Sequence, residues 1–212
     1  MATGIFGGTF DPVHIGHLRT AVELREFLRL DRMLLIPCGD PPHRETPMTP
    51  ANQRLAMVEL AIRGEPGLVV DNREIARPGF SYSMDTLEQL RAELGNDEPL
   101  CFCMGMDSLI HFATWHRWRE FLQVCHLVVV ARPGWAMPTQ GEVAEWASGH
   151  RVFDAAELLT KPAGYIFVDE MTLLPVAATA LRDKLKKNES IRYLTPDAVI
   201  DYIHSHRLYV QS

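Results

Sequence analysis

Short apolar runs alternate with helical patterns along most of the chain. Strand candidates recur at Ala2 to Phe6, Met33 to Pro37, Leu68 to Val70, Leu100 to Met104, Leu127 to Ala131 and Tyr165 to Val168. Helical candidates lie between them at Gly16 to Leu30, Ala51 to Arg63, Ser83 to Leu94, Arg117 to Val124 and Glu142 to Ser148. This alternation predicts an α/β fold, a doubly wound parallel sheet with helices on both faces.

The last forty residues change to a helical pattern alone. Helices are expected at Ala177 to Lys187 and Thr195 to Ser205, the second opening on Thr195-Pro196-Asp197, an N-cap followed by proline at the first helical position. A chain of 212 residues with 47% hydrophobic content can bury a full core. We expect a single domain, residues 1–212, with 172–212 as its helical C-terminal extension.

The charge balance narrows the partners. A net charge of -6 disfavours nucleic acid, so anionic substrates must meet locally concentrated cations. Candidates for that role are His14, His17, His43, Arg44 and Arg182. No apolar run reaches ~18 residues and the N-terminus lacks a signal pattern, which predicts a cytoplasmic protein with no membrane partner. The sequence leaves open both a monomer and a homo-oligomer.

The cysteines do not follow a metal-binding spacing. Cys38, Cys101, Cys103 and Cys125 lie in or beside apolar runs. Cys101 and Cys103 would share one face of a strand, so a metal or redox pair is an alternative, but small buried hydrophobes are favoured. We expect no structural metal.

A glycine turn joins the first strand to the first helix. Gly7-Gly8-Thr9 lacks Cβ atoms at two positions, so backbone N–H groups can approach a phosphate closely, helped by the positive end of the helix dipole. No Gly-Lys-Ser/Thr follows, and the spacing is not that of a dinucleotide fingerprint, which disfavours P-loop kinases and dehydrogenases.

Two histidines follow this turn. His14 and His17 are three residues apart at the mouth of the helix, so both imidazoles can point at one ligand. Imidazole donates a hydrogen bond in either charge state and can follow charge that grows on a phosphoryl oxygen. The alternative is a pair of helix-capping histidines.

Two signatures point to one family. Residues 7–17, GGTFDPVHIGH, resemble the first signature of the nucleotidyltransferases, and Val176 to Arg182 resembles the second, with Ala177 in place of its serine. Further motifs occur in an order similar to bacterial nicotinate-nucleotide adenylyltransferases: Pro41-Pro42-His43-Arg44, Arg54 to Met57, Ser81 to Leu87, Gly105 to Leu109 and Trp115 to Trp118.

The resemblance implies a Rossmann-like fold, a reaction and a site. The reaction joins ATP and nicotinate mononucleotide into deamido-NAD with release of pyrophosphate, a step of NAD biosynthesis, with Mg²⁺ accompanying ATP. Catalytic roles fall to His14, His17 and Arg182. The implied ATP contacts are Gly7, Gly8, Thr9, Phe10, His14, His17, Gly105, Asp107, Thr179 and Arg182. The implied mononucleotide contacts are His43, Arg44, Ser83, Thr86, Trp115 and Trp118.

Several of these residues have alternative interpretations. Gly39 to Pro50, with four prolines, is a candidate substrate loop, and Arg44 stands where the family usually has lysine. Asp107 could instead cap the next helix, Arg182 could be an ordinary surface residue, and the tryptophans could belong to the core. We favour Trp115 as a platform that stacks on the pyridine ring.

The start of the Ser83 helix bears on substrate choice. Its unpaired N–H groups favour a carboxylate over a carboxamide and thus nicotinate over nicotinamide mononucleotide. Two rival functions remain: another nucleotidyltransferase, such as one acting on phosphopantetheine, and a nucleotide sensor without turnover. Ala177 is the feature that supports the sensor.

Overall fold

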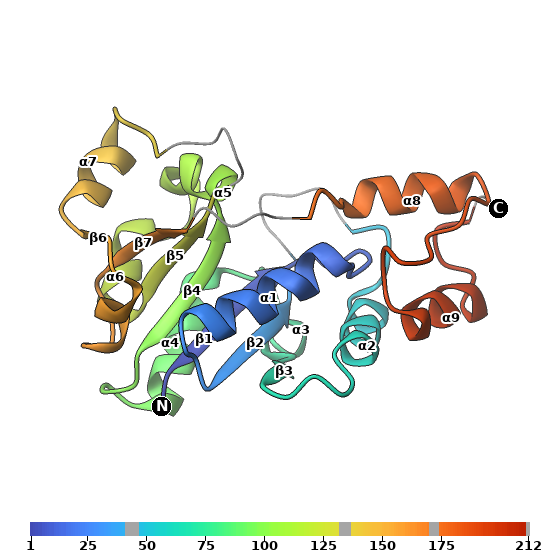
Figure 1. Cartoon of the computed structure of the whole chain (residues 1–212), viewed down its shortest axis with the longest axis horizontal. Helices are drawn as coiled ribbons and strands as arrows, with labels where there is room; N and C mark the ends of the chain where they lie inside the picture. Colours follow the sequence, from blue (N-terminus) through green and yellow to red (C-terminus); the bar gives the residue numbers. More distant parts are fainter. Residues whose placement is uncertain (41–46, 132–136, 170–173, 211–212) are drawn as a thin grey trace. The chain divides into compact units, whose positions relative to one another are not determined.

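Seven strands form one sheet in the computed structural model, which describes residues 1–40, 47–131, 137–169 and 174–210. The strands are β1 (Thr3–Gly8), β2 (Arg32–Pro37), β3 (Leu68–Val70), β4 (Leu100–Gly105), β5 (His126–Val130), β6 (Arg151–Val152) and β7 (Ile166–Asp169). Their order is β3-β2-β1-β4-β5-β7-β6 (Figure 1). The order reverses between β1 and β4, as in a doubly wound sheet. The predicted Rossmann-like α/β class is confirmed.

The helices follow the predicted pattern with small shifts in their ends. They are α1 (Ile15–Phe27), α2 (Ala51–Ala61), α3 (Arg73–Ala76), α4 (Ser83–Leu94), α5 (Met106–Ile110), α6 (Phe121–Val124), α7 (Glu142–Ser148), α8 (Ala178–Lys186) and α9 (Asp197–Ser205). Short 3₁₀ turns are η1 (Phe112–Thr114), η2 (Trp118–Glu120) and η3 (Ala155–Leu159). The sequence did not predict α3, α5 or the two-residue strand β6, which are too short to carry a periodic pattern.

The predicted helix Arg117 to Val124 is wrong at its start. Arg117 has a left-handed φ of 54° and precedes η2, and the α-helix begins only at Phe121. The guanidinium of Arg117 donates to the carboxylates of Glu88 and Glu120. These contacts hold a backbone conformation that a regular helix excludes.

The chain divides into two compact units. The first unit comprises Met1–Phe6, Arg25–Met33 and Tyr82–Thr172, and the second comprises Gly7–Leu24, Leu34–Ser81 and Leu173–Ser212. The single domain with an extension at 172–212 stays a prediction.

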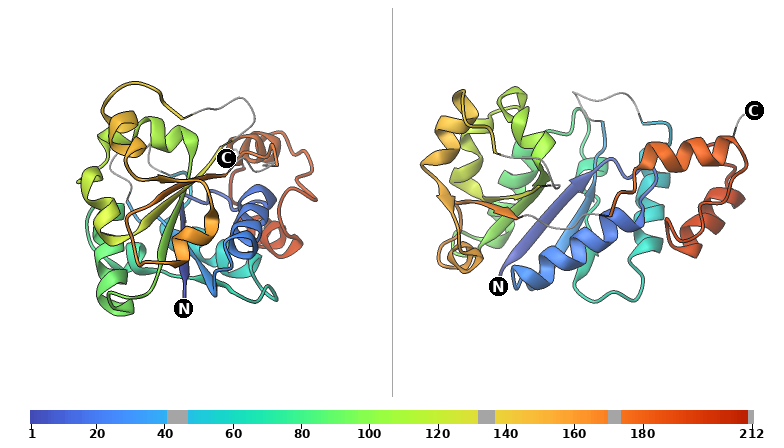
Figure 2. Two further views of the ribbon diagram at one scale, coloured as in Figure 1. Left: turned by 60° about the vertical axis from the view of Figure 1, so that its left-hand side comes forward. Right: turned by 45° about the horizontal axis from the view of Figure 1, so that its top comes forward.

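The core of the first unit is built on strands β4, β5 and β7, which lie side by side (Figure 2). Phe102 pairs with Leu127, and Val128 with Phe167. All five residues of β5 are buried. Such uniform burial is expected for a parallel strand covered on both faces.

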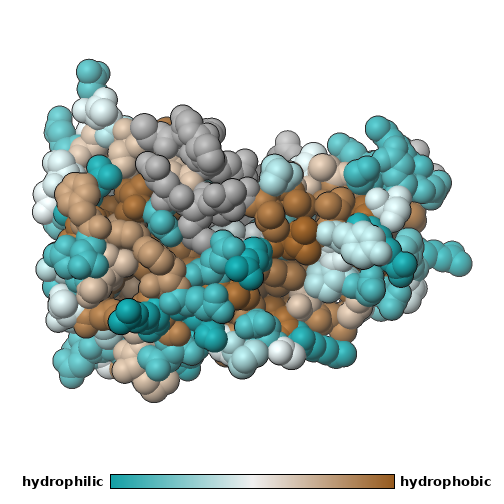
Figure 3. Space-filling model, in the orientation of Figure 1, coloured by the Kyte–Doolittle hydropathy of each residue, from teal (hydrophilic) through white to brown (hydrophobic). Residues whose placement is uncertain are grey.

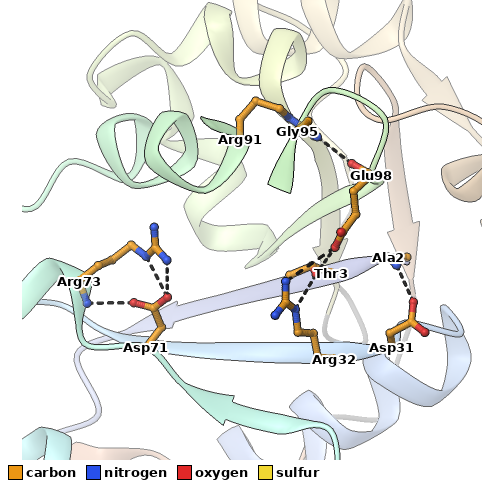
Figure 4. Close-up of polar contacts among 9 residues, drawn as sticks. All are labelled: Ala2, Thr3, Asp31, Arg32, Asp71, Arg73, Arg91, Gly95 and Glu98. Atoms are coloured by element: carbon orange, nitrogen blue, oxygen red, sulfur yellow. Dashed lines mark hydrogen bonds and ion pairs between the residues drawn. The ribbon is translucent and has the colours of Figure 1, made fainter. Parts of the chain in front are cut away.

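Polar contacts tie the segments that precede these strands (Figure 4). Thr3 Oγ1 donates to Glu98 and accepts from Arg32 Nε at 2.9 Å. The guanidinium of Arg91 donates to the backbone carbonyls of Gly95, Glu98, Val124 and Pro162. Arg91 therefore joins α4 to the loop that precedes β4, to the end of α6 and to the segment that contains Pro162.

The second unit packs α9 against α2. Val199 and Ile203 of α9 are buried, as are Met57 and Val58 of α2. Leu181 and Leu185 of α8 are buried too, while hydrophilic side chains cover its outer side (Figure 3). At the end of β3, Arg73 and Asp71 form an ion pair at 2.7 Å (Figure 4).

The start of α9 corrects one prediction. Its N-cap is Pro196, not Thr195, and its first helical residue is Asp197. The hydroxyl of Thr195 is buried and donates to the carbonyl of Val13 at 2.8 Å. A contact with a distant segment thus replaces the local cap. Within the described ranges, the helices are too short or too polar to cross a membrane.

Candidate active site

The glycine turn at the end of β1 leaves its backbone open. The strand is buried from Thr3 to Ile5, but Gly7 is exposed. A Cβ added at Gly7 would meet no heavy atom within 4 Å, whereas one at Gly8 would lie 3.0 Å from the ring of Phe10. Gly8 also accepts a hydrogen bond from the N–H of Cys38 at 2.9 Å. The turn is therefore braced at Gly8, and a ligand can approach it at Gly7.

The two signature histidines are brought together. Their rings stack with centroids 3.6 Å apart at an interplanar angle of 21°. The backbone N–H of His14 donates to Nδ1 of His17 at 3.3 Å, which places the proton of His17 on Nε2. Nδ1 of His14 is buried and has no hydrogen-bond partner among the described residues. Because buried polar atoms are rarely left unpaired, this nitrogen indicates a ligand position.

Burial keeps both rings neutral. It lowers the pKa of His14 to about 4. Burial, followed by the charge of His14, lowers the pKa of His17 to about 3. At neutral pH each imidazole carries one N–H, so the pair acts through directed hydrogen bonds, and a bound anion would raise both pKa values.

Phe10 packs against the ring of His17 and against the glycine turn. Its backbone is left-handed, with φ of 51°, and its side chain is 1% exposed. The ring meets the ring of His17 edge-on at 5.1 Å. Its side chain therefore packs under the turn, and its implied ATP contact, which stays a prediction, would involve the backbone.

Asp11 is a buried carboxylate that the sequence did not single out. Its Oδ1 accepts the hydroxyl of Tyr209 at 2.6 Å, and its Oδ2 accepts the N–H of Met48 at 2.8 Å. Hydrogen bonding to Asp11 comes second to burial in raising the pKa of Tyr209 far above its usual range. Nothing in the sequence around Tyr209 signals this contact.

The last segment of the chain also contacts residues 11–17, the histidine loop, at further points. Arg182 Nη1 donates to the carbonyl of Asp11 at 2.7 Å, and Leu194 accepts the N–H of Ile15 at 2.9 Å. Arg182 Nη2 lies 3.4 Å from the hydroxyl of Thr179. The second unit thus gathers Gly7, Gly8, Thr9, Phe10, His14, His17, Thr179 and Arg182 around one turn and one helix start. The interpretation of Arg182 as an ordinary surface residue is wrong, because it is bonded to the loop.

Ala177 lies at the N-cap of α8. Its φ and ψ are -127° and 138°, and no side chain caps the helix start. Ala177 and Thr179 are both exposed. The free N–H groups of this first turn remain available to an anion.

In the first unit, Gly105 is the last residue of β4 and Asp107 lies in the first turn of α5. Gly105 is the N-cap of α5, so the alternative that Asp107 caps this helix is wrong. The carboxylate of Asp107 folds back so closely that a Cβ at Gly105 would collide with it. Asp107 is exposed, and its implied contact with ATP stays a prediction.

Ser83 and Thr86 lie in the first turn of α4, as predicted from the sequence. The N-cap is Tyr82, and no side chain caps the helix. Thr86 is 1% exposed, and its hydroxyl donates to the carbonyl of Tyr82 at 3.4 Å. The ring of Tyr82 lies 4.5 Å from that of His116. A carboxylate could meet the N–H groups of this turn.

The two tryptophans differ in burial. Trp118 is 6% exposed and packs edge-on against Phe112 and Trp146. Trp115 is half-buried, with the ring of Phe112 at 5.4 Å. Trp115 therefore keeps more surface for a ligand, while Trp118 supports the cluster. The contact between Trp118 and Trp146 was not predicted from the sequence.

Two predicted residues, His43 and Arg44, lie outside the described residues. The described ends of the candidate substrate loop are both fixed. Ser81 Oγ accepts the N–H groups of Gly39 and Asp40 at 3.1 and 3.2 Å, and Met48 is bound to Asp11. Hydrogen bonds therefore anchor both described ends of the candidate substrate loop.

The described side chains do not form a metal site of their own. Among them there is no group of three or more His, Cys, Asp or Glu side chains that could hold an ion. A divalent cation at this site would therefore need oxygen ligands from a nucleotide.

A doubly wound parallel sheet, with a glycine turn and paired histidines after its first strand, defines an α/β nucleotide-binding protein. The chain matches the cytidylyltransferase-like family over residues 5–191. The chain belongs to this family and, within it, to the nicotinate-nucleotide adenylyltransferases.

Individual relatives span nearly the whole chain. The chain is 46% identical to a protein of Cellvibrio japonicus named "Probable nicotinate-nucleotide adenylyltransferase", over 97% of each chain. It is 48% identical to one of the same name from Aeromonas salmonicida, over 97% of this chain and 96% of the relative. The solved nicotinic acid mononucleotide adenylyltransferase of Plasmodium falciparum, complexed with NaAD, shares the fold with a TM-score of 0.72. That match is 16% identical and covers 98% of this chain and 97% of the other.

Proposed function

We propose that this protein transfers the adenylyl group of ATP to nicotinate mononucleotide, giving deamido-NAD and pyrophosphate. The name shared by the full-length relatives supports this activity. One structural observation carries it: an open glycine turn stands beside two stacked, neutral histidines, one with an unpartnered buried nitrogen. That combination suits a phosphate group whose charge grows during reaction.

The chemistry requires no protein nucleophile. A phosphate oxygen of the mononucleotide attacks the α-phosphorus of ATP in line, and the bond from that phosphorus to the bridging oxygen of pyrophosphate breaks. Backbone N–H groups of Gly7 to Thr9 bind phosphate, and Nε2–H of His17 donates to a phosphoryl oxygen. Arg182 and Thr179 bind the leaving pyrophosphate. Catalysis then consists of positioning and electrostatic stabilisation.

We expect Mg²⁺ to bind together with ATP. The ion would neutralise phosphate charge and orient the triphosphate. The described residues hold no cluster of three or more ligands for it, so the phosphate oxygens of ATP would supply ligands.

The mononucleotide side of the proposal uses the tryptophans, the start of α4 and the candidate substrate loop. Trp115 would stack on the pyridine ring, with Trp118 behind it, and Ser83 and Thr86 would receive the nicotinate carboxylate at the start of α4. His43 and Arg44 would bind the mononucleotide phosphate, and Gly105 and Asp107 the adenosine.

The test is incubation with ATP and each acceptor, with pyrophosphate as the readout. Release with nicotinate mononucleotide, but not with phosphopantetheine, supports the proposal. Release with phosphopantetheine alone would select the rival transferase. If the protein binds nucleotide but releases no pyrophosphate with any acceptor, the nucleotide sensor would be the better interpretation. The exposed Ala177 at the start of α8 is the feature that favours the sensor.

A further inference from the structure

Arg54 in α2 is a buried cation whose hydrogen bonds end on neutral groups. Its side chain is 1% exposed. Nε donates to the carbonyl of Thr49 at 3.1 Å, Nη1 to that of Thr9 at 2.7 Å, and Nη2 to those of Cys38 and Gly39 at 2.7 and 3.1 Å. In the described ranges it forms no ion pair with a carboxylate. Its donors are therefore satisfied, but its charge is not neutralised.

The charge of Arg54 lies close to the glycine turn. Thr9 ends the glycine turn, Cys38 and Gly39 follow β2, and Thr49 precedes α2. Arg54 thus binds both described ends of the candidate substrate loop to the turn that we assign to phosphate. The charge of Arg54 also affects the neighbouring thiol of Cys38. Burial raises the pKa of this thiol, and the positive charge of Arg54 acts to lower it.

A buried charge without a counter-charge is costly, and the cost falls when an anion binds nearby. The carboxylate of Glu74, which also affects the Cys38 thiol, forms no ion pair with Arg54 in the described ranges. The described surroundings therefore leave the phosphates of a nucleotide as the group that this charge would favour.

We propose that Arg54 is a positioning residue for the polyphosphate, which shapes the glycine turn through Thr9 and attracts phosphate charge from behind it without touching the ligand. This inference rests on the proposed function, since it takes the turn as the phosphate site. It goes beyond that function by assigning part of the affinity to a residue outside the contact surface.

The test measures equilibrium affinity for AMP, ADP and ATP in the unmutated protein and in Arg54→Met and Arg54→Lys. A charge effect grows with the number of phosphates. We expect Arg54→Met to weaken ATP by about tenfold or more and AMP by about threefold or less. Arg54→Lys, which keeps the charge but loses the planar fork, should retain most of the difference between ATP and AMP.

Arg91→Met provides a matched control. Arg91 also donates to four backbone carbonyls, but beside the segment that precedes β4. Its loss should lower the midpoint of thermal unfolding and leave the ratio of ATP to AMP affinity unchanged.

Two results would overturn the inference. One is a folded Arg54→Met protein that loses affinity for AMP and ATP by the same factor, which indicates a structural role alone. The other applies if Arg54→Met does not fold: an Arg54→Lys protein whose ATP to AMP ratio falls to about one. Failure of the proposed function would look different, because phosphate-dependent binding would persist without pyrophosphate release.

Discussion

Tyr209 donates its hydroxyl to the carboxylate of Asp11 at 2.6 Å, although the two residues are 198 positions apart. Both side chains are buried. Asp11 lies between the glycine turn and the histidines, so this bond connects the end of the chain with the segment proposed to carry the chemistry. A buried carboxylate that loses a donor is destabilised.

Tyr209→Phe should therefore lower both stability and turnover. We expect the free energy of unfolding to fall by about 1–3 kcal/mol, the cost of an unsatisfied buried group. We expect kcat to fall more than KM rises, because the histidine loop is less well held. Denaturant titration and steady-state kinetics measure both effects. Tyr202→Phe, in the same segment, is the control and should change neither; equal behaviour of the two variants would contradict a role for the Asp11 bond.

His17→Ala should reduce kcat by at least ~10²-fold, the usual effect of losing one donor to a developing oxyanion. We expect little change in fold stability. The measurement is kcat at saturating substrates beside thermal unfolding, with the exposed His204→Ala as control. Nearly normal turnover in a folded His17→Ala protein would remove this residue from the mechanism.

His126 should make the protein sensitive to acid. The ring is buried, Nε2 donates to the carbonyl of Lys161, and Nδ1 accepts the N–H of Tyr165, so protonation would break the second bond. Burial, the largest influence, lowers its pKa to about 4. Because the unfolded chain takes up this proton near pH ~6.5, stability is fully present above that pH and falls as the pH drops toward 4, by up to about 3 kcal/mol.

The measurement is the free energy of unfolding between pH 7 and about pH 5. His14 and His17, with lowered pKa values, contribute in the same direction. His126→Gln should reduce the slope by about one proton, ~1.4 kcal/mol per pH unit, whereas His204→Gln should not. Identical slopes in all three proteins would show that His126 is not held neutral.

Ala177→Ser should stabilise the start of α8. Ala177 has N-cap geometry without a capping side chain, and a serine there typically contributes ~1 kcal/mol. ATP affinity should stay unchanged or tighten by up to ~1.5 kcal/mol, one net hydrogen bond. Thermal unfolding and ATP titration give both values. Ala180→Ser, inside the helix, should instead lower stability slightly. A marked loss of ATP affinity in Ala177→Ser would mean that the phosphate needs the uncapped N–H groups.

The choice between acid and amide should appear in kcat/KM. The free N–H groups at the start of α4 favour a carboxylate, and a carboxamide would face them with its own donors. We expect a preference of ~10²-fold or more for nicotinate over nicotinamide mononucleotide. Thr86→Ala should reduce this preference and Thr86→Ser should retain it. Equal efficiency for both substrates in the unmutated protein would contradict the assignment and leave adenylyl transfer intact.

Local sequence pattern was enough to predict the longer helices and strands and the chemistry of one segment. Strands such as β4 and helices such as α4 were predicted from the periodicity of apolar residues, which depends only on residues close together in the sequence. The glycine turn and the pair His14 and His17 lie within eleven residues, so their proximity needed no tertiary contact.

The side chains that support that segment could be identified only in the folded protein. Tyr209 donates a hydrogen bond to Asp11, and Thr195 donates one to Val13 instead of capping α9. The buried Arg54 donates to the carbonyl of Thr9. Arg117, which is bound to Glu88 of α4, takes a left-handed conformation and shortens a predicted helix. The physical reason is shared: each contact is worth about 1 kcal/mol and forms only when segments far apart in the sequence meet, so local pattern carries no trace of it.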